Sequence, residues 1–296
     1  MVFRLESERI DYMIEVKNLY HDYEGKGNFA VSDITFKIKY GEIFGFLGPS
    51  GAGKTTVQNI MIGLLNLQKG RVTYDGKSIK NMKSGFFNKI GVSFEDPSLY
   101  LKLTGFENLK YYEGLFSVET RDPMRLLEMV GLKRAANKRV STYSKGMKQR
   151  LTFIRALLND PDVLFLDEPT AGLDPSLAKK IKDIILEQKK SDKTIFLTTH
   201  NMYIADELCD RVSFINDGKL IVTDSPRNLK LKYGSKAVKI EYKENGRVLS
   251  DILFLEKESD LEVFNKILNE KNVQTIHSQE ATLEQIFIKL TGRELV

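Results

Sequence analysis

The chain has 296 residues, of which 42% are hydrophobic and 29% charged, and its length predicts about two domains or one domain with an appendage. This composition excludes global disorder and a collagen-like chain, and the single cysteine excludes a disulfide framework or a cysteine-rich zinc site. The net charge of +5 comes from basic residues interleaved with acids, which indicates solvated surfaces and predicts no nucleic-acid partner.

Residues 1–12 show little pattern, and we expect them to form an N-terminal extension. They contain no apolar segment of the kind found in a secretory signal, and no run of about 18 apolar residues occurs anywhere in the chain. From Met13 onward, apolar and polar residues alternate with the period of a half-buried strand, and a second such pattern covers Ile34–Ile38. We therefore expect a protein without a membrane-spanning helix whose first folded segment is a strand.

Three short segments are continuously apolar, as in strands that a sheet buries on both faces: Ile43–Leu47, Val163–Leu166 and Thr194–Thr198. Helical patterns separate them, at Thr56–Leu65, Leu126–Val130, Leu151–Leu158 and Leu177–Gln188. Buried strands that alternate with helices predict an α/β fold built on a mainly parallel sheet.

The pattern changes after about residue 211. Residues 212–222 predict a β-hairpin around a glycine-containing turn, and Ser225-Pro226 interrupts the chain. Beyond it we expect two strands in 236–255, a helix over Leu261–Asn269, and a last helix that a capping box beginning at Thr282 opens. The sequence thus predicts a main domain over 13–225 and a small α/β accessory domain over 226–296.

The segment Gly48-Pro49-Ser50-Gly51-Ala52-Gly53-Lys54-Thr55 matches the phosphate-binding pattern G-x-x-x-x-G-K-[ST] between a buried strand and a helix. Its glycines let successive backbone N–H groups surround a phosphate at the start of a helix. Lys54 can reach the β- and γ-phosphates of a nucleotide, and the Thr55 hydroxyl can bind Mg²⁺.

Two carboxylates, Asp167 and Glu168, follow the buried strand that begins at Val163. The carboxyl ends of parallel strands face the ligand crevice of such sheets, and His200 closes another strand at this edge. We expect Asp167 to hold Mg²⁺ and Glu168 to orient and deprotonate an attacking water.

Residues 13–225 resemble the ATP-binding subunit of an ABC transporter. Tyr143-Ser144-Lys145-Gly146-Met147-Lys148-Gln149-Arg150 is similar to the family signature, and Ala171-Gly172-Leu173-Asp174 to its D-loop. The resemblance implies a P-loop ATPase core with an antiparallel β subdomain and a helical subdomain at about 92–160. It also implies that Tyr23 stacks on adenine and that His200 is the switch histidine. The ATP-binding residues it implies are Tyr23, Gly48, Pro49, Ser50, Gly51, Ala52, Gly53, Lys54, Thr55 and Thr56.

The resemblance further implies a head-to-tail dimer, formed with an identical or a related subunit, in which Ser144, Lys145, Gly146 and Met147 contact the partner's ATP. In that dimer Asp174 signals between the two sites. A separate membrane permease is the other implied partner, which places the chain in the cytoplasm, peripheral to the inner face of the cell membrane. The C-terminal segment from Ala281 to Arg293 resembles the extension of drug- and sodium-export ATPases.

Two residues depart from the family pattern. Lys145 replaces the first signature glycine, and Glu95 stands where a glutamine that approaches Mg²⁺ and the attacking water is usual. Glutamate keeps an oxygen ligand, adds a negative charge and loses the N–H₂ donor, so we expect Mg²⁺ binding with altered coupling to the permease. Two alternatives stay open: an ABC ATPase without a permease, such as a cluster-assembly factor, and a nucleotide sensor with little turnover.

Overall fold

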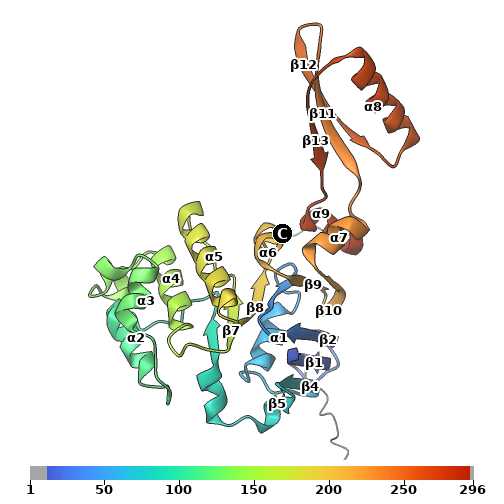
Figure 1. The fold of residues 1–296 in the computed structure, drawn as a ribbon. Coiled ribbons are helices and arrows are strands. Elements are labelled where there is room, and N and C mark those ends of the chain that lie inside the picture. The colour runs from blue at the N-terminus through green and yellow to red at the C-terminus, as the bar shows by residue number, and fades with distance from the viewer. Residues whose placement is uncertain (1–11, 294–296) are drawn as a thin grey trace, which may run out of the picture. The chain divides into compact units, whose positions relative to one another are not determined.

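A computed structural model describes residues 12–293, which divide into two compact units at residue 224 (Figure 1). We call residues 12–223 the N-terminal unit and residues 224–293 the C-terminal unit. The expected N-terminal extension lies outside the described residues except for Tyr12, which begins the first strand and so belongs to the fold.

One sheet of the N-terminal unit has four antiparallel strands in the order β2-β1-β4-β5. The strands are β1 (Tyr12–His21), β2 (Val31–Lys39), β4 (Lys69–Tyr74) and β5 (Lys77–Ser78). Alternate residues of β1 and β2 are buried, because one face of the sheet packs on the core and the other faces solvent. This sheet confirms the predicted antiparallel β subdomain.

The second sheet carries the core in the strand order β10-β9-β3-β8-β7-β6. Its strands are β3 (Ile43–Leu47), β6 (Ile90–Ser93), β7 (Val163–Asp167), β8 (Thr194–Thr199), β9 (Arg211–Asn216) and β10 (Lys219–Asp224). The five strands β9, β3, β8, β7 and β6 are parallel. Every residue of β3, β7 and β8 is buried, which confirms the three continuous apolar runs as two-sided core strands.

Helices α1 (Lys54–Met61), α2 (Gly105–Glu113), α3 (Pro123–Met129), α4 (Lys145–Arg155), α5 (Pro175–Lys190) and α6 (Met202–Leu208) complete this unit. Short 3₁₀ turns cover Ile79–Asn81, Ser84–Lys89, Lys133–Ala135 and Val140–Thr142. Figure 1 shows α2, α3 and α4 on one side of the unit and the four-stranded sheet on the other. Apolar residues of α1 share a single buried cluster with both sheets, and stacked rings such as Phe36 and Phe44, 5.3 Å apart, lie within it.

The helix predicted over Thr56–Leu65 is wrong at both ends. It begins at Lys54, because Gly53 adopts a left-handed conformation as the N-cap. It ends at Met61, because Gly63 has a φ of +78° and the N–H groups of Leu64 and Leu65 turn back to the carbonyl of Asn59.

The C-terminal unit consists of α7 (Pro226–Tyr233), β11 (Ala237–Glu244), β12 (Arg247–Phe254), α8 (Glu258–Glu270), β13 (Asn272–Gln279) and α9 (Leu283–Thr291). Its antiparallel sheet has the order β12-β11-β13, and Ile267 of α8 belongs to a small core with residues of one sheet face. Thr282 and Gln285 form the predicted capping box at the start of α9. None of the helices within residues 12–293 combines the length and apolar character needed to cross a membrane.

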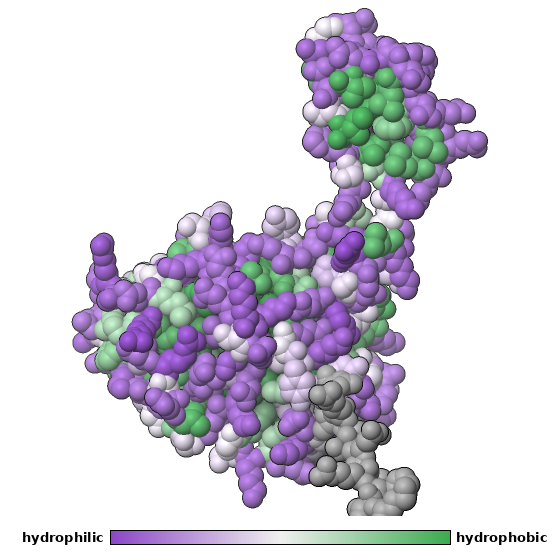
Figure 2. All heavy atoms as spheres, viewed as in Figure 1, coloured by the Kyte–Doolittle hydropathy of each residue, from purple (hydrophilic) through white to green (hydrophobic). Residues whose placement is uncertain are grey.

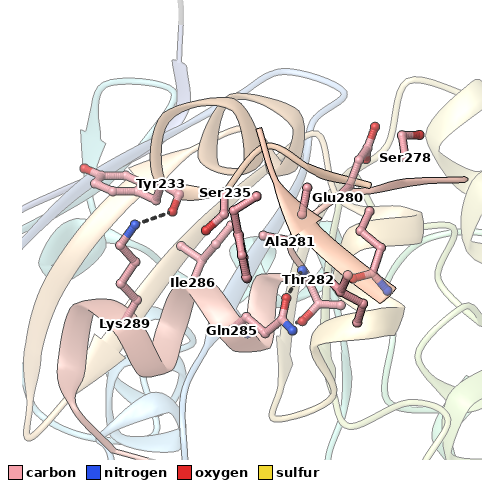
Figure 3. A pocket seen from close by; sticks show the side chains of 13 residues that line it. Tyr233, Ser235, Ser278, Glu280, Ala281, Thr282, Gln285, Ile286 and Lys289 are labelled. Carbon is pink, nitrogen blue, oxygen red and sulfur yellow. Dashed lines mark hydrogen bonds between the residues drawn. The ribbon is translucent and has the colours of Figure 1, made fainter. Parts of the chain in front are cut away.

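A cavity of about 570 Å³ lies within the C-terminal unit, between α9 and the sheet face that α8 does not cover (Figure 3). Ala237, Phe254 and Gln279 line it from the strands, while Gln285 and Lys289 line it from α9. Its polar groups bond to the protein itself: Gln285 accepts from the N–H of Thr282, and Lys289 donates to the carbonyl of Tyr233. These bonds hold α9 and the end of α7 in place.

Candidate active site

The loop from Gly48 to Thr55 connects the carboxyl end of β3 to α1. A Cβ atom at position 48 would lie 2.2 Å from the carbonyl oxygen of Ile215, so only glycine fits this close approach. Gly53 has a φ of +104°, which favours glycine for the same turn. The Nζ of Lys54 folds back over the loop and donates to the carbonyls of Gly48 at 2.7 Å and Pro49 at 2.9 Å. The loop and its lysine thus form the cradle that the sequence predicts.

The first helical turn and the exposed part of this loop supply further groups. Ser50, Gly51 and Thr55 are exposed, whereas Ala52 and Thr56 are buried. The hydroxyl of Tyr23 lies 3.0 Å from the Oγ1 of Thr56, and the Tyr23 ring is 61% exposed beside the loop. The ring of His21 contacts Tyr23 edge to face at 4.7 Å, which holds the aromatic side chain in place. An exposed ring next to a phosphate cradle is suitably placed to stack on a nucleotide base.

Asp167 is the last residue of β7, and its carboxylate lies at the same sheet edge as the loop. It accepts a hydrogen bond from the hydroxyl of Thr198, its register partner on β8. Burial raises the pKa of Asp167, and the negative charges of Glu95 and Glu168 raise it further, while the Thr198 bond and the Lys54 ammonium lower it. A carboxylate in this environment gains stability when a cation approaches it.

Glu168 follows with a φ of +45°, a conformation that is uncommon for a residue with a side chain. The residue is 6% exposed, and both oxygens of its carboxylate accept hydrogen bonds. Oε2 accepts from the Thr199 hydroxyl at 2.8 Å, and Oε1 accepts from the backbone N–H of His200 at 2.7 Å. The Nδ1 of His200 also lies 2.6 Å from Oε1, while 58% of the His200 side chain remains exposed. The strained backbone and three contacts hold this carboxylate in one orientation.

Glu95 lies in an exposed segment after β6, at the same edge of the sheet. Burial lowers the pKa of Lys54, and the charges of Glu168, Asp167 and Glu95 raise it again. The structure therefore brings Glu95 into the electrostatic environment of the phosphate loop, together with Asp167, Glu168 and His200.

The signature residues occupy the start of α4. Ser144 is the N-cap and accepts from the N–H of Met147 at 3.2 Å. No hydrogen bond or ion pair within residues 12–293 joins Ser144, Lys145, Gly146 or Met147 to the phosphate loop of the same chain. Asp174 caps α5 by accepting from the N–H of Leu177 at 3.0 Å. The hydrogen bonds of Ser144 and Asp174 thus lie at the starts of their own helices.

Sequence reasoning missed three side chains that position this site. Thr198 and Thr199 donate hydrogen bonds to the carboxylates of Asp167 and Glu168. The only sign of this in the sequence is the pair of adjacent threonines before His200. Gln149 of α4 donates to the backbone carbonyl of Glu168 at 3.4 Å, which links the signature helix to the carboxylate pair. No sequence spacing indicates that last contact.

The oxygen donors of the site fit magnesium. Residues 12–293 contain no group of three His, Cys, Asp or Glu side chains placed to hold a metal alone. Mg²⁺ is commonly held by one or two carboxylates together with substrate phosphates and water, so a full protein cage is not needed. The exposed hydroxyl of Thr55 and the carboxylates of Asp167 and Glu95 supply ligands of that kind.

Comparisons with known proteins agree with this geometry. The family model "ABC transporter" matches residues 31–171. The fluoroquinolones export ATP-binding protein of Mycobacterium tuberculosis (strain CDC 1551 / Oshkosh) is 48% identical over 96% of this chain and 94% of its own length. The Nod factor export ATP-binding protein I of Rhizobium johnstonii is 34% identical over 95% of this chain and 96% of its own length. A dimeric ATP-binding cassette in a post-hydrolysis state, bound to ADP and Pi, superposes with a TM-score of 0.66 at 27% identity, covering 72% of this chain and 98% of that one.

Proposed function

The chain belongs to the ABC transporter family of ATP-binding proteins, and from that premise we propose that it hydrolyses ATP to power export through a separate membrane permease. The observation that carries this proposal is the fixed carboxylate of Glu168 beside the phosphate loop. The relatives at 48% and 34% identity are both named as export ATP-binding proteins. Neither the relatives nor the described residues favour an ATPase that works without a permease.

Glu168 is the proposed general base. A water between Glu168 and the γ-phosphate attacks phosphorus, its proton passes to the Glu168 carboxylate, and the bond to the β-phosphate oxygen breaks to release ADP and phosphate. Lys54 and the N–H groups of the loop balance the negative charge that the phosphates bring. The exposed edge of the His200 ring is available to the γ-phosphate, while its Nδ1 holds Glu168. Thr55, Asp167 and Glu95 are the residues that would hold Mg²⁺, which would supply further charge neutralisation at the phosphates.

The signature residues complete the site of a partner chain in this proposal. Ser144 and the N–H of Gly146 lie at the start of an eleven-residue helix, where the helix dipole favours negative charge. Among residues 12–293 no hydrogen bond or ion pair joins them to the phosphate loop, and a nucleotide held by a second subunit is the group they suit. Lys145 adds a positive charge at the same place, which the γ-phosphate tolerates. Asp174, at the start of α5, signals between the two sites.

The permease docks on an apolar groove next to the Glu95 segment. This groove has a volume of about 310 Å³, and Phe87, Val92 and Phe94 line it together with Tyr112. Arg155 forms part of its wall and is held by hydrogen bonds to the Ser98 carbonyl and the Tyr112 hydroxyl. An amphipathic helix of the permease fits such a surface. Docking there places the chain at the inner face of the cell membrane.

Replacing Glu168 with glutamine tests the catalytic assignment. Glutamine keeps the acceptor oxygen for Thr199 or His200 but cannot take a proton, so we expect ATP turnover to fall by about 100-fold or more. Binding of a fluorescent ATP analogue should be retained within about 3-fold of wild type, because the phosphate loop is unchanged. Glu187→Gln, on the exposed face of α5, is the matched control. A Glu168→Gln turnover rate close to wild type would show that another group is the base.

A further inference from the structure

One edge strand of the C-terminal sheet, β13, differs in charge from the other edge strands described in this chain. The longer edge strands β2, β10 and β12 each carry both acidic and basic residues, and β5 and β6 are only two and four residues long. In contrast, β13 has eight residues and contains no Lys, Arg, Asp, Glu or Pro. Charged residues and short length are the usual protection of a sheet edge against pairing with another chain. Among the described strands, β13 is therefore a long edge without that protection.

The apolar side chains beside this edge are also incompletely covered. Ile276 of β13 is directly opposite Ile240 of β11 and shares its sheet face. Ile240 is fully buried, whereas 46% of Ile276 is exposed. On α8, which packs on the same face, Leu261 and Leu268 are 38% and 42% exposed. Figure 2 shows apolar side chains gathered over this part of the C-terminal unit.

We propose that β13 pairs with β13 of a second copy of this chain across a two-fold axis, so that the two sheets become one. In such an isologous contact residue i of one copy meets residue j of the other, and residues near the axis meet their own kind, so a charge near the middle of β13 would face its like. β13 has no Lys, Arg, Asp or Glu and meets this requirement, whereas β12 carries Asp251 next to its midpoint and does not. Eight residues give an edge about 27 Å long, and pairing satisfies its outward backbone groups and covers both copies of Ile276.

The cavity on the other face of the sheet does not compete with this interpretation. It lies on the face of Ala237, opposite to that of Ile240, and the polar groups of Thr282, Gln285 and Lys289 that line it already bond within the unit. The proposed contact needs no nucleotide. It therefore holds two chains together while their ATP sites are empty, and this association is separate from any dimer closed by ATP.

Sedimentation of the full chain without nucleotide tests the proposal. We expect wild type to sediment with twice the 33.8 kDa mass of one chain, and Ile276→Lys to sediment as a single chain, because two ammonium groups then meet near the axis. Val248→Lys is the matched control: Val248 is 59% exposed on the opposite edge strand and the opposite face, and its variant should remain a dimer. A single-chain mass for wild type, or a dimer that survives in Ile276→Lys, would overturn the proposal.

Cysteine cross-linking provides a test that does not depend on disrupting the surface. Copper-phenanthroline should oxidise the thiols of Ile276→Cys to a disulfide between two chains, and it should leave Val248→Cys as single chains. Burial raises the pKa of the native Cys209 thiol, so this residue contributes little background. Cross-linking at Val248 instead of Ile276 would assign the contact to the other edge. ATP-analogue binding by all four variants should match wild type, which separates this result from the ATPase proposal.

Discussion

The parallel core strands of the N-terminal unit and the outer strands of the C-terminal sheet are buried to very different extents. All residues of β3 and β7 in the N-terminal unit are buried, whereas β13 in the C-terminal unit has none buried and β12 has one. Strands covered on both faces can expose functional groups only at their ends, and Asp167, Glu168 and the phosphate loop lie there. A sheet covered on one face instead exposes its edge and flank. This difference supports our proposals that the N-terminal unit carries out the chemistry and that the C-terminal unit provides a surface for association.

The largest expected effect is a loss of stability that is confined to the C-terminal unit. Ile240→Ala leaves a cavity in a core of only five buried residues, and we expect it to cost about 3 kcal/mol. Hydrogen exchange should rise across 237–279, while ATP-analogue binding stays within about 2-fold of wild type. Ile195→Ala, at a fully buried position of β8, is the matched variant and should weaken ATP binding. Equal loss of ATP binding in both variants would contradict the separation of roles.

The next effect compares two serine caps, one in each unit. Ser144 caps α4 and Ser225 caps α7, with oxygen-to-nitrogen distances of 3.2 and 3.1 Å. Either change to alanine should cost about 1 kcal/mol of stability, because the same kind of cap is lost. Only Ser144→Ala should reduce ATP turnover, by about 10-fold, because only Ser144 is proposed to contact a partner's phosphate. Equal turnover in the two variants would remove Ser144 from the nucleotide site.

A smaller effect concerns the stability that the fold loses by holding the Asp167 carboxylate in a buried place close to other carboxylates. Burial raises the pKa of Asp167, so its ionised form destabilises the nucleotide-free fold at pH values above that raised pKa. Asp167→Asn can still accept from Thr198, and we expect it to raise nucleotide-free stability by about 1 kcal/mol while lowering turnover. Chemical unfolding at pH 7.5 measures this gain, and it should disappear at acidic pH, where Asp167 is protonated. A less stable Asp167→Asn protein would contradict this electrostatic account.

The smallest effect should follow Glu95→Gln. The charge of Glu95 raises the pKa of Asp167, so its removal keeps Asp167 ionised to a lower pH. The acid limb of the pH–rate profile should therefore move to lower pH, with turnover at pH 7 changed by no more than about 3-fold, or ~0.6 kcal/mol. Asp96→Asn is the neighbouring control. A Mg²⁺ titration of the ATPase rate of both variants measures whether the affinity for the metal changes as well. Identical pH–rate profiles and Mg²⁺ titrations for Glu95→Gln and wild type would show that Glu95 has no role at the metal site.

Sequence reasoning was most accurate where local patterns decide the structure. The continuous apolar runs gave β3, β7 and β8, because burial on both faces leaves a direct signal in the residues. The phosphate loop was found because its glycines are required by a backbone approach such as that of Gly48 to Ile215. Contacts that depend on pairing between strands distant in the sequence could not be predicted. Thr198 reaches Asp167 only because β7 and β8 pair in one register, and no local pattern shows that register.

The charge pattern of β13 illustrates the same limit. The sequence predicts no element over Asn272–Gln279, between the helix expected over Leu261–Asn269 and the capping box at Thr282, because this segment lacks a run of apolar residues. The strand exists because β11 pairs with it over most of its length, and its meaning as an unprotected edge emerges only from the strand order. Tertiary pairing, and not intrinsic preference, decides such a strand.

The most direct test of the central claim uses the double variant Ile276→Lys, Glu168→Gln. The first change removes the proposed nucleotide-independent contact, and the second prevents hydrolysis while ATP remains bound. Sedimentation should give the 33.8 kDa mass of one chain without nucleotide and twice that mass with saturating ATP and Mg²⁺. This result would show that two chains enclose ATP through the N-terminal unit. A mass that saturating ATP leaves unchanged would contradict the account.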